Sequence, residues 1–365
     1  MTSKLLKNTD IETILRRVGI NTLIDQLIEK LKTGFSQLNK DSSLIPARTG
    51  IHYSNPDIGL LEWMPASVGD GTVSLKIVGY HPSNPEQNGL PTILSSLCVF
   101  DSTSGHLRGI MDGTFPTALR TGAMSALATS LMADSTRAST LGIIGCGAQS
   151  VTQCHALSRT LPIDKIIAYD RDPDSAASLA QRIAFLEIPV EVVSVSNLES
   201  LLERSDILCT CTSETPGSGP LFRDFPNKPG LHVNAVGSDF PDKYELPVEL
   251  LQRSVVIPDF REQALVEGEC QQLEPDKVTH DLTSLLNVSG LQKHCKTTLS
   301  VFDSTGHAYA DYLTGLLFMQ HAHEMRIGSD IELECTPTDP KNPYSFLTKE
   351  SLPELHAKEA NASLR

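Results

Sequence analysis

Three cations that interrupt apolar or strand-like runs are the first candidates for chemistry in this chain. Arg48 follows a Pro-Ala pair, Lys76 lies within SLKIV, and Arg120 lies within the helical stretch PTALRTGAMSALATSLMA. Each of them alone is interpreted most simply as a solvated position. Together, beside a small-molecule pocket, the three cations would bind a carboxylate or a cofactor phosphate, and Arg can bind either group with two hydrogen bonds.

Two acids stand in comparable places. Glu62 lies in the strand-like run LLEWM, and Asp239 lies two residues past Gly237, in the loop after the run GLHVNAVG. An Asp in such a loop most often caps the turn. Because ligands of open α/β sheets gather at the carboxyl ends of strands, Asp239 could equally be a general base beside a hydride-transfer centre. The residues alone leave both interpretations of Asp239 open.

A glycine-rich turn predicts a dinucleotide site. In TLGIIGCGAQSVTQCHAL, residues 140–157, an apolar strand runs into Gly145-x-Gly147-x-x-Ser150 and then into a helix. The first glycine permits the tight turn, the second lets a pyrophosphate approach the backbone, and Ser150 is small enough for the helix to pack on the strand. Asp170 ends the next apolar run, about twenty residues further on, where a carboxylate binds the ribose hydroxyls. The acid favours NAD over NADP, although Arg171 follows it and could accept a phosphate.

Composition excludes several classes of function. A net charge of −14 on 365 residues argues against a nucleic-acid or anionic-membrane surface. No apolar run approaches the ~20 residues of a membrane span, and the N-terminus lacks the features of a secretory signal. Eight cysteines without a Cys-x-x-Cys pair predict free thiols, the cytoplasm and no metal site. Cys209-x-Cys211 and His321-x-His323 are interpreted as structural.

The patterns around these residues change near residue 138. Before it, a helical stretch capped at Asn8-Thr9-Asp10 and divided at Gly19 precedes several strand-like runs. The last two of these runs predict a hairpin with its turn at 101–105, in an antiparallel or mixed sheet. After it, short apolar strands alternate with helices, which predicts a doubly wound parallel sheet.

Seven longer motifs carry a resemblance to a known family. They are MPASVGDGTVSLKIVGYHPSNP, GLPTIL, MDGTFPTALRTGAMSALAT, LGIIGCGAQSVTQCHALS, NAVGSDFPDKYELP, EGECQQL and SVFDSTG. With these motifs the chain, from about residue 45 to 325, resembles the ornithine cyclodeaminase/μ-crystallin family, and within it the bacterial lysine cyclodeaminase branch.

The resemblance implies an α/β fold with a discontinuous first domain. A Rossmann-type doubly wound parallel sheet, residues 126–312, would be inserted into an α+β substrate-binding and dimerisation domain that begins at residues 1–125. Residues 313–365 would return to that first domain. The family also implies a homodimer.

The activity implied is an NAD-dependent cyclisation of a small basic amino acid. Hydride would leave the substrate Cα to NAD, the terminal amine would attack the resulting imine, ammonia would depart, and hydride would return to the cyclic imine. Lysine would give pipecolate and ornithine would give proline. The alternatives are an imine reductase or amino-acid dehydrogenase that consumes NAD(P)H, and a μ-crystallin-like binding protein without turnover.

Residue roles follow from the resemblance position by position. Asp239 would exchange protons with the substrate amines, Glu62 would pair with a substrate ammonium, and the three cations would bind the substrate carboxylate. Ser238 departs from the pattern, because the family often has glycine there. The implied cofactor-lining positions are Thr92, Arg120, Gly145, Gly147, Ala148, Gln149, Asp170, Thr212, Val236, Gly237, Lys243 and Ser304.

Overall fold

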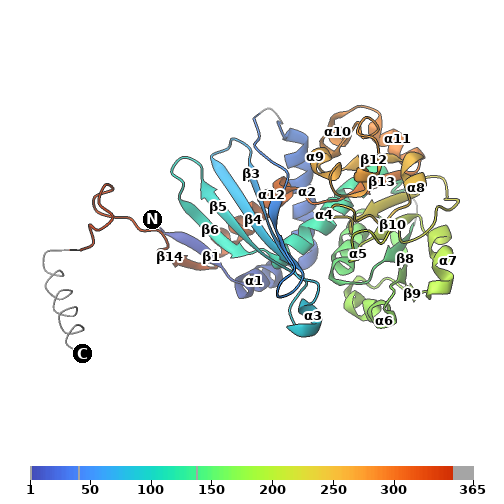
Figure 1. Ribbon diagram of the computed structural model, residues 1–365, viewed down its shortest axis with the longest axis horizontal. Coiled ribbons are helices and arrows are strands. Elements are labelled where there is room, and N and C mark those ends of the chain that lie inside the picture. The colour runs from blue at the N-terminus through green and yellow to red at the C-terminus, as the bar shows by residue number, and fades with distance from the viewer. Residues whose placement is uncertain (1, 40–41, 137–138, 348–365) are drawn as a thin grey trace.

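Two seven-stranded sheets divide the chain between them (Figure 1). The computed structural model describes residues 2–39, 42–136 and 139–347. The first sheet takes strands from both ends of the described chain, and the second takes only the strands between residues 139 and 303. The expected insertion of one sheet between two parts of the other is therefore present in the strand order.

The first sheet is mixed, in the order β14-β1-β6-β5-β4-β3-β2. Only β1 and β6 pair in parallel, and the other neighbours are antiparallel. The hairpin turn at 101–105 is confirmed: Asp101 Oδ1 accepts hydrogen bonds from the backbone of Thr103 and Ser104. The strands are β1 (Ser3–Leu6), β2 (Thr49–Tyr53), β3 (Gly59–Ser67), β4 (Thr72–Tyr80), β5 (Ile93–Asp101), β6 (Leu107–Asp112) and β14 (Ser329–Ile331).

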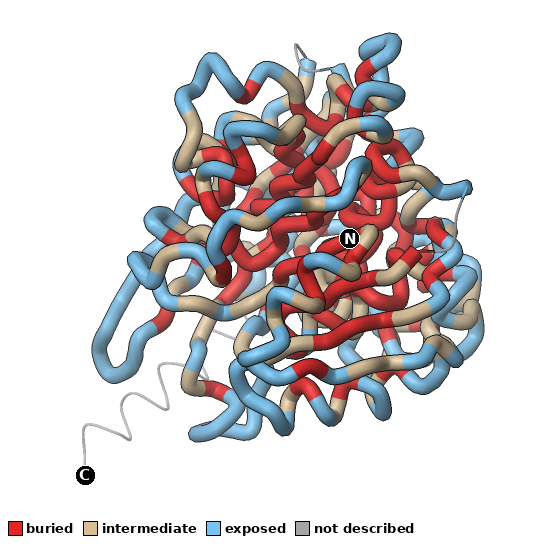
Figure 2. The backbone as a smooth tube through the Cα atoms, turned by 90° about the vertical axis from the view of Figure 1, so that its right-hand side faces the viewer, coloured by how far each residue is buried: buried red, intermediate tan, exposed pale blue. Residues whose placement is uncertain are grey.

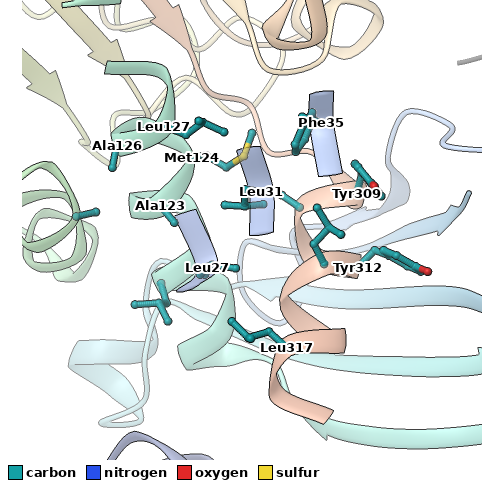
Figure 3. Close-up of a cluster of buried hydrophobic side chains, with 14 of the residues drawn as sticks. Leu27, Leu31, Phe35, Ala123, Met124, Ala126, Leu127, Tyr309, Tyr312 and Leu317 are labelled. Carbon is teal, nitrogen blue, oxygen red and sulfur yellow. The ribbon is translucent and has the colours of Figure 1, made fainter. Parts of the chain in front are cut away.

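Helices α1 (Asn8–Val18), α2 (Ile20–Gln37) and α12 (Ala308–Met325) form the helical layer beside this sheet. Gly19, at φ +83°, separates the first two as predicted, because a left-handed backbone favours glycine. Figure 3 shows how the layer closes: side chains of α2, α4 (Thr114–Met132) and α12 meet in one apolar cluster. Its labelled members are Leu27, Leu31, Phe35, Ala123, Met124, Ala126, Leu127, Tyr309, Tyr312 and Leu317.

Helix α4 leads from the first sheet to the second and contacts both helical layers. The expected domain boundary at 125/126 lies inside α4, and the boundary at 312/313 lies inside α12. Each boundary therefore falls within a continuous helix rather than in a linker, and the division into domains stays a proposal.

The second sheet is entirely parallel, in the order β12-β13-β11-β10-β7-β8-β9. The chain winds outward from β7 in one direction and from β10 in the other, which confirms the doubly wound class. Its strands are β7 (Ser139–Ile144), β8 (Ile163–Tyr169), β9 (Val190–Val192), β10 (Ile207–Thr210), β11 (His232–Ala235), β12 (Val255–Pro258) and β13 (Ser300–Asp303). The remaining helices are α3 (Asn84–Gln87), α5 (Ala148–Thr160), α6 (Pro173–Arg182), α7 (Leu198–Arg204), α8 (Val248–Gln252), α9 (Arg261–Ala264), α10 (Leu282–Asn287) and α11 (Leu291–Thr297), with the 3-10 turns η1 (Ala184–Leu186), η2 (Val195–Asn197) and η3 (Glu269–Gln272).

The central strands of the second sheet are buried on both faces. All residues of β10, β11 and β13 are buried, and Figure 2 shows the buried backbone gathered in the interior. Helices cover both sides of a parallel sheet, so even polar residues of these strands are buried, among them His232, Asn234, Ser300 and Asp303. In the described part of the chain, no helix has both the length and the apolar character that a membrane span requires.

Candidate active site

The glycine turn joins β7 to α5 at the point where the strand order reverses. Gly145 has φ +93°, and a Cβ there would lie 2.7 Å from the carbonyl oxygen of Cys211. Gly147 precedes α5 and is exposed, and a Cβ there would meet no described atom within 4 Å. Ser150 is fully buried and donates to the Gly147 carbonyl. The turn therefore leaves open space over the second glycine, where a pyrophosphate needs to approach.

Asp170 lies directly after β8 and faces this turn. Its Oδ2 accepts a hydrogen bond from Cys146 N at 2.6 Å, and its Oδ1 accepts one from Asp172 N. Arg182 of α6 supports the same turn by donating to the carbonyls of Cys146 and Gly147, a role that the sequence analysis missed. Arg171, considered above for a phosphate, forms an ion pair with Glu214.

A buried acid joins the loops that follow two further strands of the second sheet. Glu245 accepts hydrogen bonds from Thr210 Oγ1, from Thr212 N and Oγ1, and from Gly237 N, at 2.6–2.9 Å. It thereby ties the ends of β10 and β11 together. A Cβ on Gly237 would lie 2.3 Å from Glu245 Oε1, which explains the glycine. Glu245 stands in a motif quoted above, but no feature of the sequence distinguished it from a surface acid.

Other expected cofactor positions lie around these loops or beside the first sheet. Ala148 is exposed at the start of α5, and Gln149 donates to Thr152 Oγ1. Ser304 follows β13, and its buried Oγ has no hydrogen-bond partner among the described residues. Thr92 precedes β5, where its carbonyl accepts a bond from the backbone of His81. Val236 is buried directly after β11.

Asp239 extends from the β11 loop toward Lys243. Lys243 Nζ lies 2.7 Å from Asp239 Oδ1 and is buried, whereas the Asp239 side chain is 37% exposed. Burial lowers the pKa of Lys243, but Asp239 and its other acidic neighbours raise it above the usual value. The departure at Ser238 has a structural reason: its hydroxyl donates to the Lys243 carbonyl and closes the loop. Asp239 is thus held next to a cation at the carboxyl end of the sheet.

Arg48 directly precedes β2 of the first sheet, and its side chain reaches the loop that contains Asp239. Its Nη2 donates to the Asp239 carbonyl at 2.7 Å and lies 2.6 Å from Glu267 Oε1. Its Nε lies 3.7 Å from Glu62 Oε2. Burial lowers the pKa of the Arg48 guanidinium, but Glu267, Glu62 and Asp239 raise it above the ordinary value. Arg48 and Glu62 are thus brought together with Asp239, and Glu267 is a fourth charged member that the sequence analysis did not assign.

Lys76 and Arg120 share one buried counter-ion. Lys76 Nζ lies 2.8 Å from Asp311 Oδ2, and Arg120 Nε lies 2.8 Å from Asp311 Oδ1. All three side chains are at most 6% exposed, so the solvated interpretation of the two cations is wrong. Burial and the charges of Arg120 and Arg48 lower the pKa of Lys76 to about 8, although Asp311 opposes the shift. Arg48 therefore shares an electrostatic environment with this trio.

The Cys and His pairs have structural surroundings. Cys211 Sγ donates to the Gly145 carbonyl, and His321 pairs with Gln26. Cys209 is fully buried in an apolar cluster beneath the second sheet. Within the described ranges, no group of three or more His, Cys, Asp or Glu side chains is arranged to hold a metal ion.

The chain is similar to known proteins in both sequence and fold. The model of the ornithine cyclodeaminase/mu-crystallin family matches residues 8–324. An L-lysine cyclodeaminase of Streptomyces rapamycinicus is 39% identical over 95% of this chain and all of its own length.

The fold is also similar to those of solved structures. A lysine cyclodeaminase, described for its recognition of L-lysine, L-ornithine and L-2,4-diaminobutyric acid, superimposes with a TM-score of 0.90. It is 40% identical and covers 95% of this chain and 100% of its own. An archaeal alanine dehydrogenase dimer with bound NAD has a TM-score of 0.79 and 26% identity, covering 92% of this chain and 100% of its own.

Proposed function

Because this chain belongs to the ornithine cyclodeaminase/μ-crystallin family, we propose that it is an NAD-dependent cyclodeaminase of basic L-diamino acids. It converts L-lysine to L-pipecolate or L-ornithine to L-proline, with release of ammonia and no net redox change. The solved lysine cyclodeaminase that covers 95% of this chain supports both the reaction class and the substrate class.

The observation that carries this proposal is the division of charge within the site. Around Asp311, two buried cations face one acid. Around Arg48 and Lys243, two cations face three acids, namely Glu62, Asp239 and Glu267. An L-diamino acid whose α-amine is neutral carries one carboxylate and one distal ammonium. The surplus positive charge around Asp311 is complementary to the carboxylate of such a substrate. The surplus negative charge around Arg48 and Lys243 is complementary to its distal ammonium.

The residues around the glycine turn fit NAD. The open space over Gly147, the first turn of α5 and the exposed approach to the turn suit a pyrophosphate at a helix N-terminus. Asp170 would hold the adenosine ribose, and the unpartnered Ser304 hydroxyl offers a further polar contact. When bound, NAD supplies the hydride acceptor and its reduced form the hydride donor for the substrate Cα.

The protein's own groups bind the substrate and move its protons. Lys76 and Arg120 bind the carboxylate, and this fixes Cα, whereas Arg48, which the resemblance also assigned to the carboxylate, pairs with Glu62 and Glu267. Asp239 accepts the proton of the α-ammonium, so that the nitrogen lone pair becomes available, and returns a proton to the departing ammonia. Ring closure is intramolecular, and a pocket that holds the folded chain by both charged ends gives it a high effective concentration.

The test is the stoichiometry of ammonia and NADH. Purified protein with L-lysine or L-ornithine and substoichiometric NAD should release many equivalents of ammonia without growth of NADH absorbance. One NADH formed or consumed per product would identify an amino-acid dehydrogenase or imine reductase instead. Ligand binding with neither ammonia nor NADH would identify a binding protein.

We also propose a cytoplasmic homodimer that forms through the first sheet. On the face of this sheet opposite α12, apolar side chains remain half-buried or exposed, and a large apolar face of this kind marks a contact surface. The related alanine dehydrogenase was solved as a dimer, and the eight free thiols suit a reducing compartment. The face includes Ile51, Leu61, Trp63, Leu75, Ile77 and Cys98.

Light scattering would test the dimer. The native protein should scatter with the mass of two chains. The Leu61→Asp variant should have the mass of one chain, because a carboxylate cannot be buried unpaired between two apolar faces. Val195→Asp is the matched control, since Val195 is 67% exposed in η2, between β9 and α7 and outside the first sheet. A native protein with the mass of a single chain would contradict the proposal.

A further inference from the structure

Glu267 is an acid of the site to which no role has been given. It lies between α9 and η3, and its side chain is 8% exposed. Its Oε1 lies 2.6 Å from Arg48 Nη2, the same nitrogen that donates to the Asp239 carbonyl. Despite this short separation the pair does not meet hydrogen-bond geometry, and the buried Oε1 has no hydrogen-bond partner in the described part of the chain. The Glu267 carboxylate is therefore paired with one cation, but its hydrogen-bonding capacity is unused and is available to a ligand.

The neighbourhood of Glu267 lacks one positive charge. Arg48 lies against both Glu267 and Glu62, and Lys243 is taken by Asp239. Burial raises the pKa of Glu267 to about 7, Arg48 opposes the shift, and Glu62 and Asp239 add to it. The ionised carboxylate is thus costly in the free protein, and an incoming cation would relieve that cost.

The three acids differ in how they are engaged. Asp239 already has a cation at 2.7 Å and is 37% exposed. Glu62 stands between Arg48 and His52, whose Nε2 is 3.9 Å from its Oε1. Of the three, only Glu267 has a carboxylate oxygen that is fully buried and has no hydrogen-bond partner among the described residues. Among the three, it is the acid best placed to accept a new charged hydrogen bond.

We propose that Glu267 binds the distal ammonium of the substrate and thereby selects diamino acids over monoamino acids. This inference rests on the proposed function, because it takes the carboxylate to lie at Lys76 and Arg120. Glu267 and Asp311 then serve opposite ends of the substrate: Glu267 faces the distal ammonium directly, and Asp311 holds the two cations that bind the carboxylate. Substrates whose side chains reach from the carboxylate-binding cations to Glu267 are accepted. An amino acid without the distal amine brings no ammonium to Glu267.

The test compares two ligands that differ only in the distal amine. L-Lysine and L-norleucine are titrated into NADH-loaded protein, which has no hydride acceptor, and the fluorescence of bound NADH reports binding. Glu267→Gln should weaken L-lysine roughly 10- to 100-fold, the usual size of a lost charged hydrogen bond. L-Norleucine should change by less than about threefold. Glu262→Gln, an exposed acid on α9, is the matched control and should change neither.

The comparison of two ligands distinguishes direct contact between Glu267 and the ammonium from an indirect effect of Glu267 through Arg48. Equal weakening of both ligands would mean that Glu267 only holds Arg48, and an unchanged affinity for L-lysine would mean that Glu267 does not meet the ammonium. Either result overturns the inference. Glu267→Asp keeps the charge and should retain a preference for L-lysine even if the glutamine variant folds poorly. A native protein that binds L-lysine in preference to L-norleucine but releases no ammonia would contradict the proposed function alone.

Discussion

The buried trio of Lys76, Arg120 and Asp311 allows a quantitative prediction for Asp311→Asn. The substitution keeps the size of the side chain and removes its charge, which leaves two cations without their shared counter-ion. Asp311 lies 2.8 Å from both cations, and all three side chains are at most 6% exposed. Removal of one partner from a buried ion pair costs about 3–5 kcal/mol.

Lys76 limits part of this cost because it can release its proton. Its pKa in the folded protein is about 8, so deprotonation at pH 7 costs about 1.4 kcal/mol. Arg120 cannot release its proton, so the rest of the destabilisation comes from its unpaired buried charge. We therefore expect Asp311→Asn to lower the free energy of unfolding by about 3 kcal/mol at pH 7.

The pH dependence has a definite sign. The pKa of Lys76 is lower in the folded chain than its ordinary value of 10.5, so the unfolded chain binds more protons between about pH 8 and pH 10.5, and this group adds stability as the pH rises. At pH 9 the wild-type Lys76 is already mostly neutral, whereas at pH 6 it is charged and needs Asp311. The loss caused by Asp311→Asn should be about 1–3 kcal/mol larger at pH 6 than at pH 9.

Urea unfolding followed by tryptophan fluorescence would measure both quantities. Trp63 is the sole tryptophan and lies on β3, paired with Ile77 beside Lys76. The matched control is Asp330→Asn, which breaks the exposed ion pair with Lys4 and should cost no more than about 1 kcal/mol. A loss below about 1 kcal/mol for Asp311→Asn, or an equal loss at the two pH values, would refute the reasoning.

Three further predictions concern the cofactor and the base. Gly147→Val should fold normally, because a Cβ there meets no described atom within 4 Å, but should weaken NADH binding by more than about tenfold; unchanged binding would remove the pyrophosphate from this turn. Asp170→Ala should lower the affinity for NAD relative to NADP, and an unaltered ratio would show that Asp170 does not meet the ribose. Asp239→Asn should keep the fold and NADH binding while lowering turnover by about 10²-fold or more; near-normal turnover would leave Asp239 as a loop cap and make Glu62 the candidate base.

The sequence alone was sufficient for the features that depend on neighbouring residues. The strand, the two glycines and the helix after them form one local unit, and Asp170 ends the next strand along the chain. The doubly wound sheet followed from alternating strands and helices, and the split of the first helical stretch followed from Gly19. Short-range geometry determines all of these, because a left-handed turn or a helix start is encoded within a few residues.

Only the tertiary structure decided how the charged residues are paired. Arg120 and Asp311 are 191 positions apart, and Arg48 lies far in the chain from Glu267. In the sequence, a charged residue that will face solvent cannot be distinguished from one that will be buried against a partner, as Asp311 and Glu245 illustrate. The cost of an unpaired buried charge makes such pairing essential, but the partner is chosen by packing between distant elements, which the sequence around either residue does not record.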